Sequence, residues 1–336
     1  MSGLRAPGPM TGHAGKKPRG EAEASTPHGG ERTAGLPRTL RACPTWAMGI
    51  LAVAALMRGV APAQDFEHIL AERVATGLVY ADGITWAREG FLVFADAGKR
   101  KLYRLDPGGS QPKPTEEDPN GGQGLAYDSQ GRLYICEPWT RRVVRMERKG
   151  KIEPFAESFE GKKLNGPDDV AVRKDGNVYF TDPAFGSAAD TRELDFNGVY
   201  HVTPKGEIEA VAKWKTRPNG IALSPDGKTL YVGDGDRHAV VAFSLDGRGA
   251  ATDPRDLITK ISGVPNGMRT DVTGRLYVGA KGLQIYSPEG KLLHTMLSGD
   301  VITNCAFGDN DFETLYASAG KAVYKIRLGV KGALQY

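Results

Sequence analysis

Six polar side chains recur along residues 82 to 304, each at the start of a similar short phrase. All are carboxylates or amides, and a small or apolar run typical of a β-strand follows each one. The six are Asp82, Gln123, Asp168, Asn219, Asn266 and Asn304. Oxygen donors without His or Cys favour calcium or magnesium over zinc. If the phrases occupy equivalent positions, these lead residues face one place, which is a candidate site for a metal and a substrate.

The spacing of the lead residues predicts the fold. Successive positions differ by 41, 45, 51, 47 and 38. Repeats of about 40 to 50 residues built from short strands are typical of a β-propeller. We therefore predict an all-β chain, a six-bladed β-propeller with four-stranded blades over residues 64–336. Residues His68 to Thr76 are predicted to form an outer strand that pairs with the last blade.

The direction of the strands predicts a second group of acids on the same face. An inner strand that starts at a lead residue runs away from that face, and the next strand returns to it. Four of the returning strands end in an acid, at Asp96, Glu137, Asp182 and Asp234. Acids crowded on one face raise each other's pKa unless a cation neutralises them. The alternative is that each one accepts hydrogen bonds from neighbouring backbone N–H groups.

Composition and charge limit the class of partner. The chain has 336 residues, 40% of them hydrophobic, and its 44 Gly and 21 Pro suit a turn-rich all-β protein. The formal charge of +4 arises in residues 1–63, which hold eight basic and three acidic residues, so 36 basic and 37 acidic residues remain. The remainder has a charge of −1, which argues against nucleic acid or an anionic membrane as a partner. The expected partner is a small-molecule substrate, and the sequence does not determine the oligomeric state.

The first 63 residues have the pattern of a targeting segment. Residues 1–40 are predicted to be a disordered or wrongly assigned extension. Residues 41–63 resemble a signal peptide, with an apolar stretch from Trp46 to Met57 and a cleavage site near Ala63. Export to the periplasm or the medium is expected, with no stable membrane span after cleavage, because twelve apolar residues are too few to cross a bilayer. The alternative is an uncleaved interfacial anchor.

Cysteine usage and the common catalytic motifs add little. Cys136 and Cys305 follow the leader and are expected to be free, buried residues, with a bond between them as the alternative. The sequence contains no C-x-x-C, G-x-S-x-G or H-E-x-x-H motif. The chemistry is therefore expected to depend on the lead residues.

Several phrases resemble one known family. These are Asp82-Gly-x-x-Trp, Leu164-Asn-Gly-Pro-Asp-Asp-Val-Ala-Val, Arg217-Pro-Asn-Gly-Ile-Ala-Leu-Ser-Pro-Asp-Gly, Pro265-Asn-Gly-Met and Thr303-Asn-Cys-Ala-Phe-Gly. They resemble the gluconolactonase, senescence marker protein and luciferin-regenerating enzyme family, in order, from about residue 66 to 330. The resemblance implies a six-bladed propeller that holds a divalent cation, usually calcium, at the mouth of its central channel.

The resemblance implies Asp82, Asp168, Asn219 and Asn266 as the ligands of Ca²⁺, with Mg²⁺ or another divalent cation as alternatives. The family typically has Glu, Asn and an acid where this chain has Asp82, Asp168 and Asn266. Two carboxylates and two amides are still present. Because position 266 lacks its usual acid, the general base is expected to be Asp168 or Asp234.

The expected activity is hydrolysis of a sugar lactone or a similar small ester, with the cation polarising the carbonyl group. Residues 184–197 form a candidate lid that carries Phe185 and Arg192, and these two are expected to bind substrate together with Gln123 and Asn304. Two alternatives remain open. One is a phosphotriesterase-like hydrolase that uses the same ion, and the other is a non-enzymatic propeller that binds a sugar or a protein.

Overall fold

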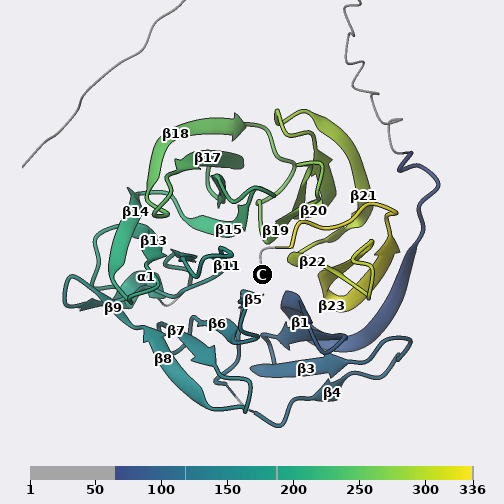
Figure 1. Ribbon diagram of the computed structural model, residues 1–336, viewed down its shortest axis with the longest axis horizontal. Helices are drawn as coiled ribbons and strands as arrows, with labels where there is room; N and C mark the ends of the chain where they lie inside the picture. Colours follow the sequence, from purple (N-terminus) through teal and green to yellow (C-terminus); the bar gives the residue numbers. More distant parts are fainter. Residues whose placement is uncertain (1–64, 118, 187, 335–336) are drawn as a thin grey trace, which may run out of the picture. The chain divides into compact units, whose positions relative to one another are not determined.

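Strands make up most of the described chain, and Figure 1 shows them arranged as a ring of sheets around a central axis. The structure is a computed structural model that describes residues 65–117, 119–186 and 188–334. The expectations for residues 1–40, for 41–63 and for cleavage near Ala63 lie outside the described residues. No helix within the described ranges has the length and apolar character needed to cross a membrane.

The chain forms an all-β propeller. Its first sheet has the order β22 (Asn304–Gly308), β23 (Thr314–Arg327), β1 (Ala71–Ala87), β2 (Phe91–Asp96), β3 (Lys101–Leu105) and β4 (Lys113–Pro114). The second contains β5 (Leu125–Tyr127), β6 (Leu133–Glu137), β7 (Arg142–Met146) and β8 (Ile152–Ala156). The third contains β11 (Val170–Val172), β12 (Val178–Asp182), β13 (Asn197–Val202) and β14 (Ile208–Trp214).

Two further sheets complete the ring. One contains β15 (Pro218–Leu223), β16 (Thr229–Asp234), β17 (Ala239–Leu245) and β18 (Ala251–Ile258). The other contains β19 (Met268–Thr270), β20 (Leu276–Tyr286) and β21 (Leu292–Val301). A short hairpin of β9 (Ser158–Phe159) and β10 (Lys162–Lys163) and the helix α1 (Ala188–Thr191) are the other described elements.

The prediction of six separate four-stranded blades is wrong in the number of sheets, because the described strands form five sheets around the ring. The reason lies in β1, which is 17 residues long. Its first part pairs with β23, from Ala71 with Ile326 to Thr76 with Ala322, and its last part pairs with β2. The predicted outer strand at 68–76 therefore does pair with the last repeat. It continues directly into the inner strand of the first repeat and joins the two into one sheet.

The six repeat phrases form the inner strands, as expected. The strands β1, β5, β11, β15, β19 and β22 each contain a lead residue or start within two residues of one, and Figure 1 shows these strands next to the centre of the ring. In four phrases the lead residue is followed by glycine, and the glycine has a steric role. A Cβ at Gly83 would lie 1.5 Å from the backbone oxygen of Gln123, and one at Gly220 would lie 1.8 Å from that of Asn266. The glycines thus allow neighbouring inner strands to approach closely.

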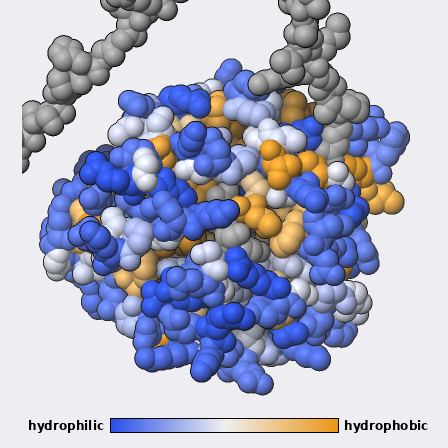
Figure 2. Space-filling view, viewed as in Figure 1, coloured by the Kyte–Doolittle hydropathy of each residue, from blue (hydrophilic) through white to orange (hydrophobic). Residues whose placement is uncertain are grey.

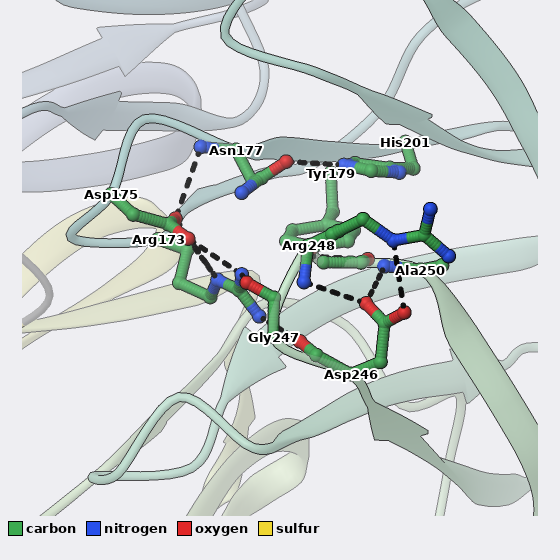
Figure 3. Close-up of polar contacts among 10 residues, drawn as sticks. Arg173, Asp175, Asn177, Tyr179, His201, Asp246, Gly247, Arg248 and Ala250 are labelled. Atoms are coloured by element: carbon green, nitrogen blue, oxygen red, sulfur yellow. Dashed lines mark hydrogen bonds and ion pairs between the residues drawn. The ribbon is translucent and has the colours of Figure 1, made fainter. Parts of the chain in front are cut away.

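A polar cluster joins the third and fourth sheets (Figure 3). The Arg173 guanidinium pairs with Asp175 and donates to the backbone oxygens of Asp246 and Gly247 across the interface. The Tyr179 hydroxyl donates to the backbone oxygen of Gly249 at 2.8 Å. These contacts satisfy polar groups between two sheets that otherwise pack through apolar side chains.

The C-terminal segment closes the end of the channel where the inner strands finish. The N–H of Ala333 donates to the oxygen of Thr270 at 2.9 Å, and Asp271 forms a bridge with Gly332. Ala333 and Leu334 line a cavity of about 80 Å³ together with the ends of the inner strands. Figure 1 shows the segment after β23 running towards the centre of the ring, and Figure 2 shows this face as mainly hydrophilic, with a hydrophobic area beside the centre. The opposite end of the channel, where the inner strands begin, remains for a ligand.

Candidate functional site

A cavity of about 980 Å³ opens at the end of the channel where the inner strands begin. Asp82, Asp168, Asn219 and Asn266 all line it. These residues come from different inner strands and lie far apart in the sequence. The structure thus brings the four predicted ligands to one cavity. Asp82, Asp168 and Asn219 are each at least 94% buried, so they form its deepest part.

The acids at the bottom of this cavity are strongly perturbed. Burial and, to a smaller extent, the charge of Asp169 raise the pKa of Asp82 to about 8, with a hydrogen bond from Gln123 acting in the opposite direction. Burial also raises the pKa of Asp168 well above its usual range, and the charges of Asp82 and Asp169 add to this. Carboxyl groups that interact in this way cannot all be ionised without a neighbouring positive charge.

Gln123 is the lead residue that contacts a predicted ligand directly. Its Nε2 donates to Oδ2 of Asp82 at 3.4 Å, and its side chain also lines the cavity. This contact orients one carboxylate oxygen. Gln123 thus lines the cavity, and its hydrogen bond goes to another site residue.

Asn219 carries an unusual amide. Its Oδ1 is buried and has no hydrogen-bond partner among the described residues. A buried carbonyl oxygen without a partner costs about 1–3 kcal/mol, so such an atom usually has a functional explanation. By contrast, Oδ1 of Asn266 accepts the N–H of Gly267 at 3.0 Å. Asn219 thus carries an acceptor that is unpartnered within the described residues, and it also lines the cavity.

A third acid, Asp169, lies beneath the predicted ligands. Its Oδ2 accepts the N–H of Ile221 at 3.1 Å, and its Oδ1 accepts from Nδ2 of Asn304 at 3.5 Å. Asn304 is 1% exposed and is not among the described residues that line the cavity, so the structure does not support its predicted contact with substrate. Its amide belongs to the layer that holds Asp169.

Arg269 provides the positive charge of this lower layer. It projects from β19 across the ring, and its Nη2 donates to the backbone oxygen of Leu125 in β5 at 3.3 Å. Its charge lowers the pKa of Asp169 and offsets part of the increase due to burial. The sequence analysis missed both residues. The Asp168-Asp169 pair was the signal that could have revealed them. Four other lead residues are followed by glycine, and a buried acid in that position needs a positively charged or hydrogen-bonding partner.

The second group of acids tethers the loops before the lead residues. Asp96 accepts the N–H groups of Val79 and Tyr80, at 3.0 and 2.9 Å. Asp182 accepts those of Asn165 and Gly166, at 2.9 and 2.7 Å. The alternative interpretation, acceptance of backbone N–H groups, therefore describes these acids.

Asp234 follows the same pattern. It accepts from the Thr216 hydroxyl at 2.8 Å and from the N–H of Arg237 at 3.0 Å. It is 1% exposed and is not among the described residues that line the cavity. The structure therefore places this predicted base outside the cavity, in a position that holds a loop, whereas Asp168 lies within it.

The loops around the mouth contribute a further set of residues. Phe185, Gly186 and Thr191 from the predicted lid line the cavity, whereas Arg192 is exposed and does not. Sequence reasoning missed several others because they lie outside the repeated phrase, in loops or in other parts of the strands. These are Tyr80, Trp139, Arg141, Val264, Lys281 and Val301.

The donor set fits a hard divalent cation. Within residues 65–117, 119–186 and 188–334, no three His, Cys, Asp or Glu side chains are grouped as a metal site, so a cation here would need amide as well as carboxylate oxygens. The unpartnered Asn219 oxygen and the two buried acids provide both kinds. Calcium accepts carboxylate and carbonyl oxygens in flexible geometry, and the breadth of the cavity leaves space for water and substrate.

Comparison with known proteins identifies the family. The family model described as the SMP-30/gluconolactonase/LRE-like region matches residues 80–321, a range that contains all six lead residues. The chain belongs to this family. The family indicated by the repeated phrases is thus confirmed.

Individual members of the SMP-30/gluconolactonase/LRE-like family extend the match over most of the chain. A gluconolactonase of Zymomonas mobilis is 29% identical over 289 residues, which cover 76% of this chain and 80% of the relative. The structure of a gluconolactonase from Xanthomonas campestris has a TM-score of 0.71 at 27% identity and covers 77% of this chain and 89% of its own. The calcium-binding protein regucalcin of Agrobacterium tumefaciens shares the fold at 18% identity, with a TM-score of 0.63. The match covers 77% of this chain and 92% of the regucalcin chain.

Proposed function

We propose that the protein is a lactone hydrolase whose cavity holds a divalent cation, calcium in the first instance, between Asp82, Asp168, Asn219 and Asn266. The observation that carries the proposal is the buried Asn219 oxygen without a partner, which lines the same cavity as two acids of raised pKa. The similarity to gluconolactonases supports lactones as the substrate class.

The chemistry that a bound cation would supply is polarisation of the lactone carbonyl and stabilisation of the charge that develops on its oxygen, an effect worth several kcal/mol. The chain's own residues position the reactants. Gln123 fixes one oxygen of Asp82 through its amide. Beneath them, the backbone N–H of Ile221 and the amide of Asn304 hold Asp169 in place.

Asp168 is the group that takes a proton from the attacking water in this proposal. It lines the cavity, whereas Asp234 does not. Burial and the charges of Asp82 and Asp169 raise its pKa. A carboxylate whose pKa is raised accepts a proton more readily than an ordinary one, as general base catalysis requires.

The experiment is a hydrolysis assay on protein freed of divalent cations and then supplied with Ca²⁺. Lactones and a phosphotriester are offered in parallel, which separates lactonase from phosphotriesterase activity. We expect lactone hydrolysis to fall at least about 100-fold without the cation and to return with Ca²⁺. Asn219→Ala should reduce it, whereas Asn310→Ala, at an exposed position in a hairpin, should not. Equal rates with and without the cation would overturn the proposal.

A further inference from the structure

We infer that the preferred substrate is a lactone with an apolar substituent, aromatic or alkyl, rather than a polyhydroxylated sugar lactone. The inference rests on the proposed lactone hydrolase function and deepens it. The observation is the distribution of exposed hydrophobic side chains over the described residues. Eleven large hydrophobic residues are exposed, and five of these line the cavity. The five are Tyr80, Trp139, Phe185, Val264 and Val301.

These five residues, which we call the rim, surround the mouth from several directions. Tyr80 lies in β1, Trp139 follows β6 and Phe185 follows β12, so three aromatic residues come from three successive repeats. Val264 precedes β19 and Val301 ends β21, which adds an aliphatic part from a fourth. Exposed apolar side chains gathered around a concavity are typical of a ligand-binding site.

Two of the three aromatic rings of the rim, those of Trp139 and Phe185, each contact an arginine. The guanidinium of Arg100 lies 5.1 Å from the centre of the Trp139 ring, and that of Arg217 lies 5.1 Å from the centre of the Phe185 ring. Arg217 in turn pairs with the Asp236 carboxylate. Each arginine stabilises its ring through a cation–π contact. The rings are thus ordered before a ligand arrives, as expected for apolar recognition.

Three of the polar side chains that line the same cavity, Gln123, Asp300 and Arg141, already bind other residues of the chain. Gln123 donates to Asp82, and Asp300 accepts the Tyr324 hydroxyl at 2.9 Å. Arg141 donates to the backbone oxygens of Leu164, Thr191 and Lys163. A sugar lactone would need several free donors and acceptors for its hydroxyl groups, since each hydroxyl loses its hydrogen bonds to water on binding. The occupied polar groups and the apolar rim together favour an apolar substituent.

The volume of the cavity agrees with this inference. At about 980 Å³ it lies near the upper end of the range of ligand pockets, roughly 300–1,000 Å³. With the lactone carbonyl at Asp82, Asp168 and Asn219 in the deepest part, space remains between that point and the rim. A substituent on the lactone ring would occupy this space and bring its apolar surface against the aromatic residues.

The test compares δ-decalactone and dihydrocoumarin with glucono-1,5-lactone on the full chain with Ca²⁺. We expect kcat/KM for both apolar lactones to exceed that for the sugar lactone by at least about tenfold. Trp139→Ala and Val264→Ser should each lower kcat/KM for δ-decalactone by about tenfold, and should lower that for glucono-1,5-lactone by a smaller factor. Val272→Ser is the matched control, because Val272 is 54% exposed, as against 45% for Val264, and lies outside the cavity.

The outcomes separate this inference from the proposed function. Equal or higher kcat/KM for the sugar lactone would overturn the inference and leave the lactonase proposal standing. If the wild-type protein hydrolysed none of the three lactones, the lactonase proposal would be refuted. Calorimetry with the lactam analogue of δ-decalactone would then decide the inference. Binding of the lactam that weakens in Trp139→Ala supports an apolar ligand site, and no binding, or binding unchanged in Trp139→Ala, overturns it.

Discussion

Gly220 lies so close to Asn266 that a Cβ on the glycine would be 1.8 Å from the backbone oxygen of the asparagine. Gly267 lies similarly close to the side chain of Asn304, whose Cγ would lie 2.0 Å from such an atom. The ring of oxygen donors therefore depends on the residue after each donor. Where that residue is glycine, the neighbouring strands can bring their side chains to one cavity.

Substitution of Gly220 should disrupt this contact. For Gly220→Ala we expect a loss of about 3 kcal/mol or more in the free energy of unfolding, because the obstructing atom belongs to the backbone and cannot rotate away. Urea unfolding followed by fluorescence measures the change. Gly247→Ala is the control, since nothing lies within 4 Å of its Cβ position. Equal stability of the two variants would contradict the prediction, because it would show that the neighbouring strands move apart at little cost to make room for the added Cβ of the Gly220→Ala variant.

The carboxylate of Asp182 should be essential for the loop that precedes Asp168. Asp182→Ala would leave the buried N–H groups of Asn165 and Gly166 without their acceptor, at a cost of about 2–4 kcal/mol in unfolding free energy. Asp182→Asn keeps one acceptor oxygen and should lose less unfolding free energy than the alanine variant. The comparison is made by urea unfolding at pH 7.5. If the alanine variant were as stable as the asparagine variant, the tethering role would be refuted.

Exchange of a carboxylate and an amide tests the role of Asp168. Asp168→Asn should lower kcat for lactone hydrolysis by at least about 100-fold, because an amide cannot accept the proton from water. The double variant Asp168→Asn/Asn266→Asp restores two carboxylates to the cavity and should regain about tenfold of the loss. Steady-state kinetics on one lactone measures kcat for the single and the double variant. Full activity of Asp168→Asn would assign the base elsewhere.

His201 should make stability depend on pH. Burial lowers its pKa below the ordinary 6.5, against a smaller opposing effect of Glu209, and Nδ1 has no hydrogen-bond partner among the described residues. The other ring nitrogen contacts Oδ1 of Asn177 at 2.6 Å (Figure 3). Because the unfolded chain binds a proton more readily than the folded one, the stabilising contribution is complete above about pH 6.5 and is lost as pH falls through the lower folded pKa.

The measurement for His201 is the free energy of unfolding at pH 7.5 and at pH 5.5. Wild-type protein should lose about 1 kcal/mol more over this interval than His201→Gln, whose side chain carries no titratable group and keeps a donor for Asn177. An identical loss in both proteins would mean that His201 is protonated as easily when folded as when unfolded.

The sequence predicted the parts of the fold that repeat. A regular period and the strand direction were enough to predict the inner strands and the outer strand at 68–76. They also predicted one common face for Asp82, Asp168, Asn219 and Asn266. The period and the strand direction did not predict that two repeats merge into one sheet. This merging depends on whether the chain turns between two strands or runs straight on, as β1 does, and no residue type decides this.

The rest of the site could not be predicted because it depends on loops and on contacts between distant residues. Arg269 reaches Leu125, which lies 144 positions away in the sequence. Trp139 enters the cavity from a loop outside the repeated phrase. Strand direction placed Asp234 on the correct face, but it could not show that Thr216 and the N–H of Arg237 donate to its oxygens.

The central claim is that oxygens from separate inner strands hold one divalent cation, and calorimetric titration of Ca²⁺ into cation-free protein tests it most directly. The account predicts one ion per chain, at least about tenfold weaker binding in Asn219→Ala and unchanged binding in Asn310→Ala. Absence of binding, or an affinity that Asn219→Ala leaves unaltered, would contradict it.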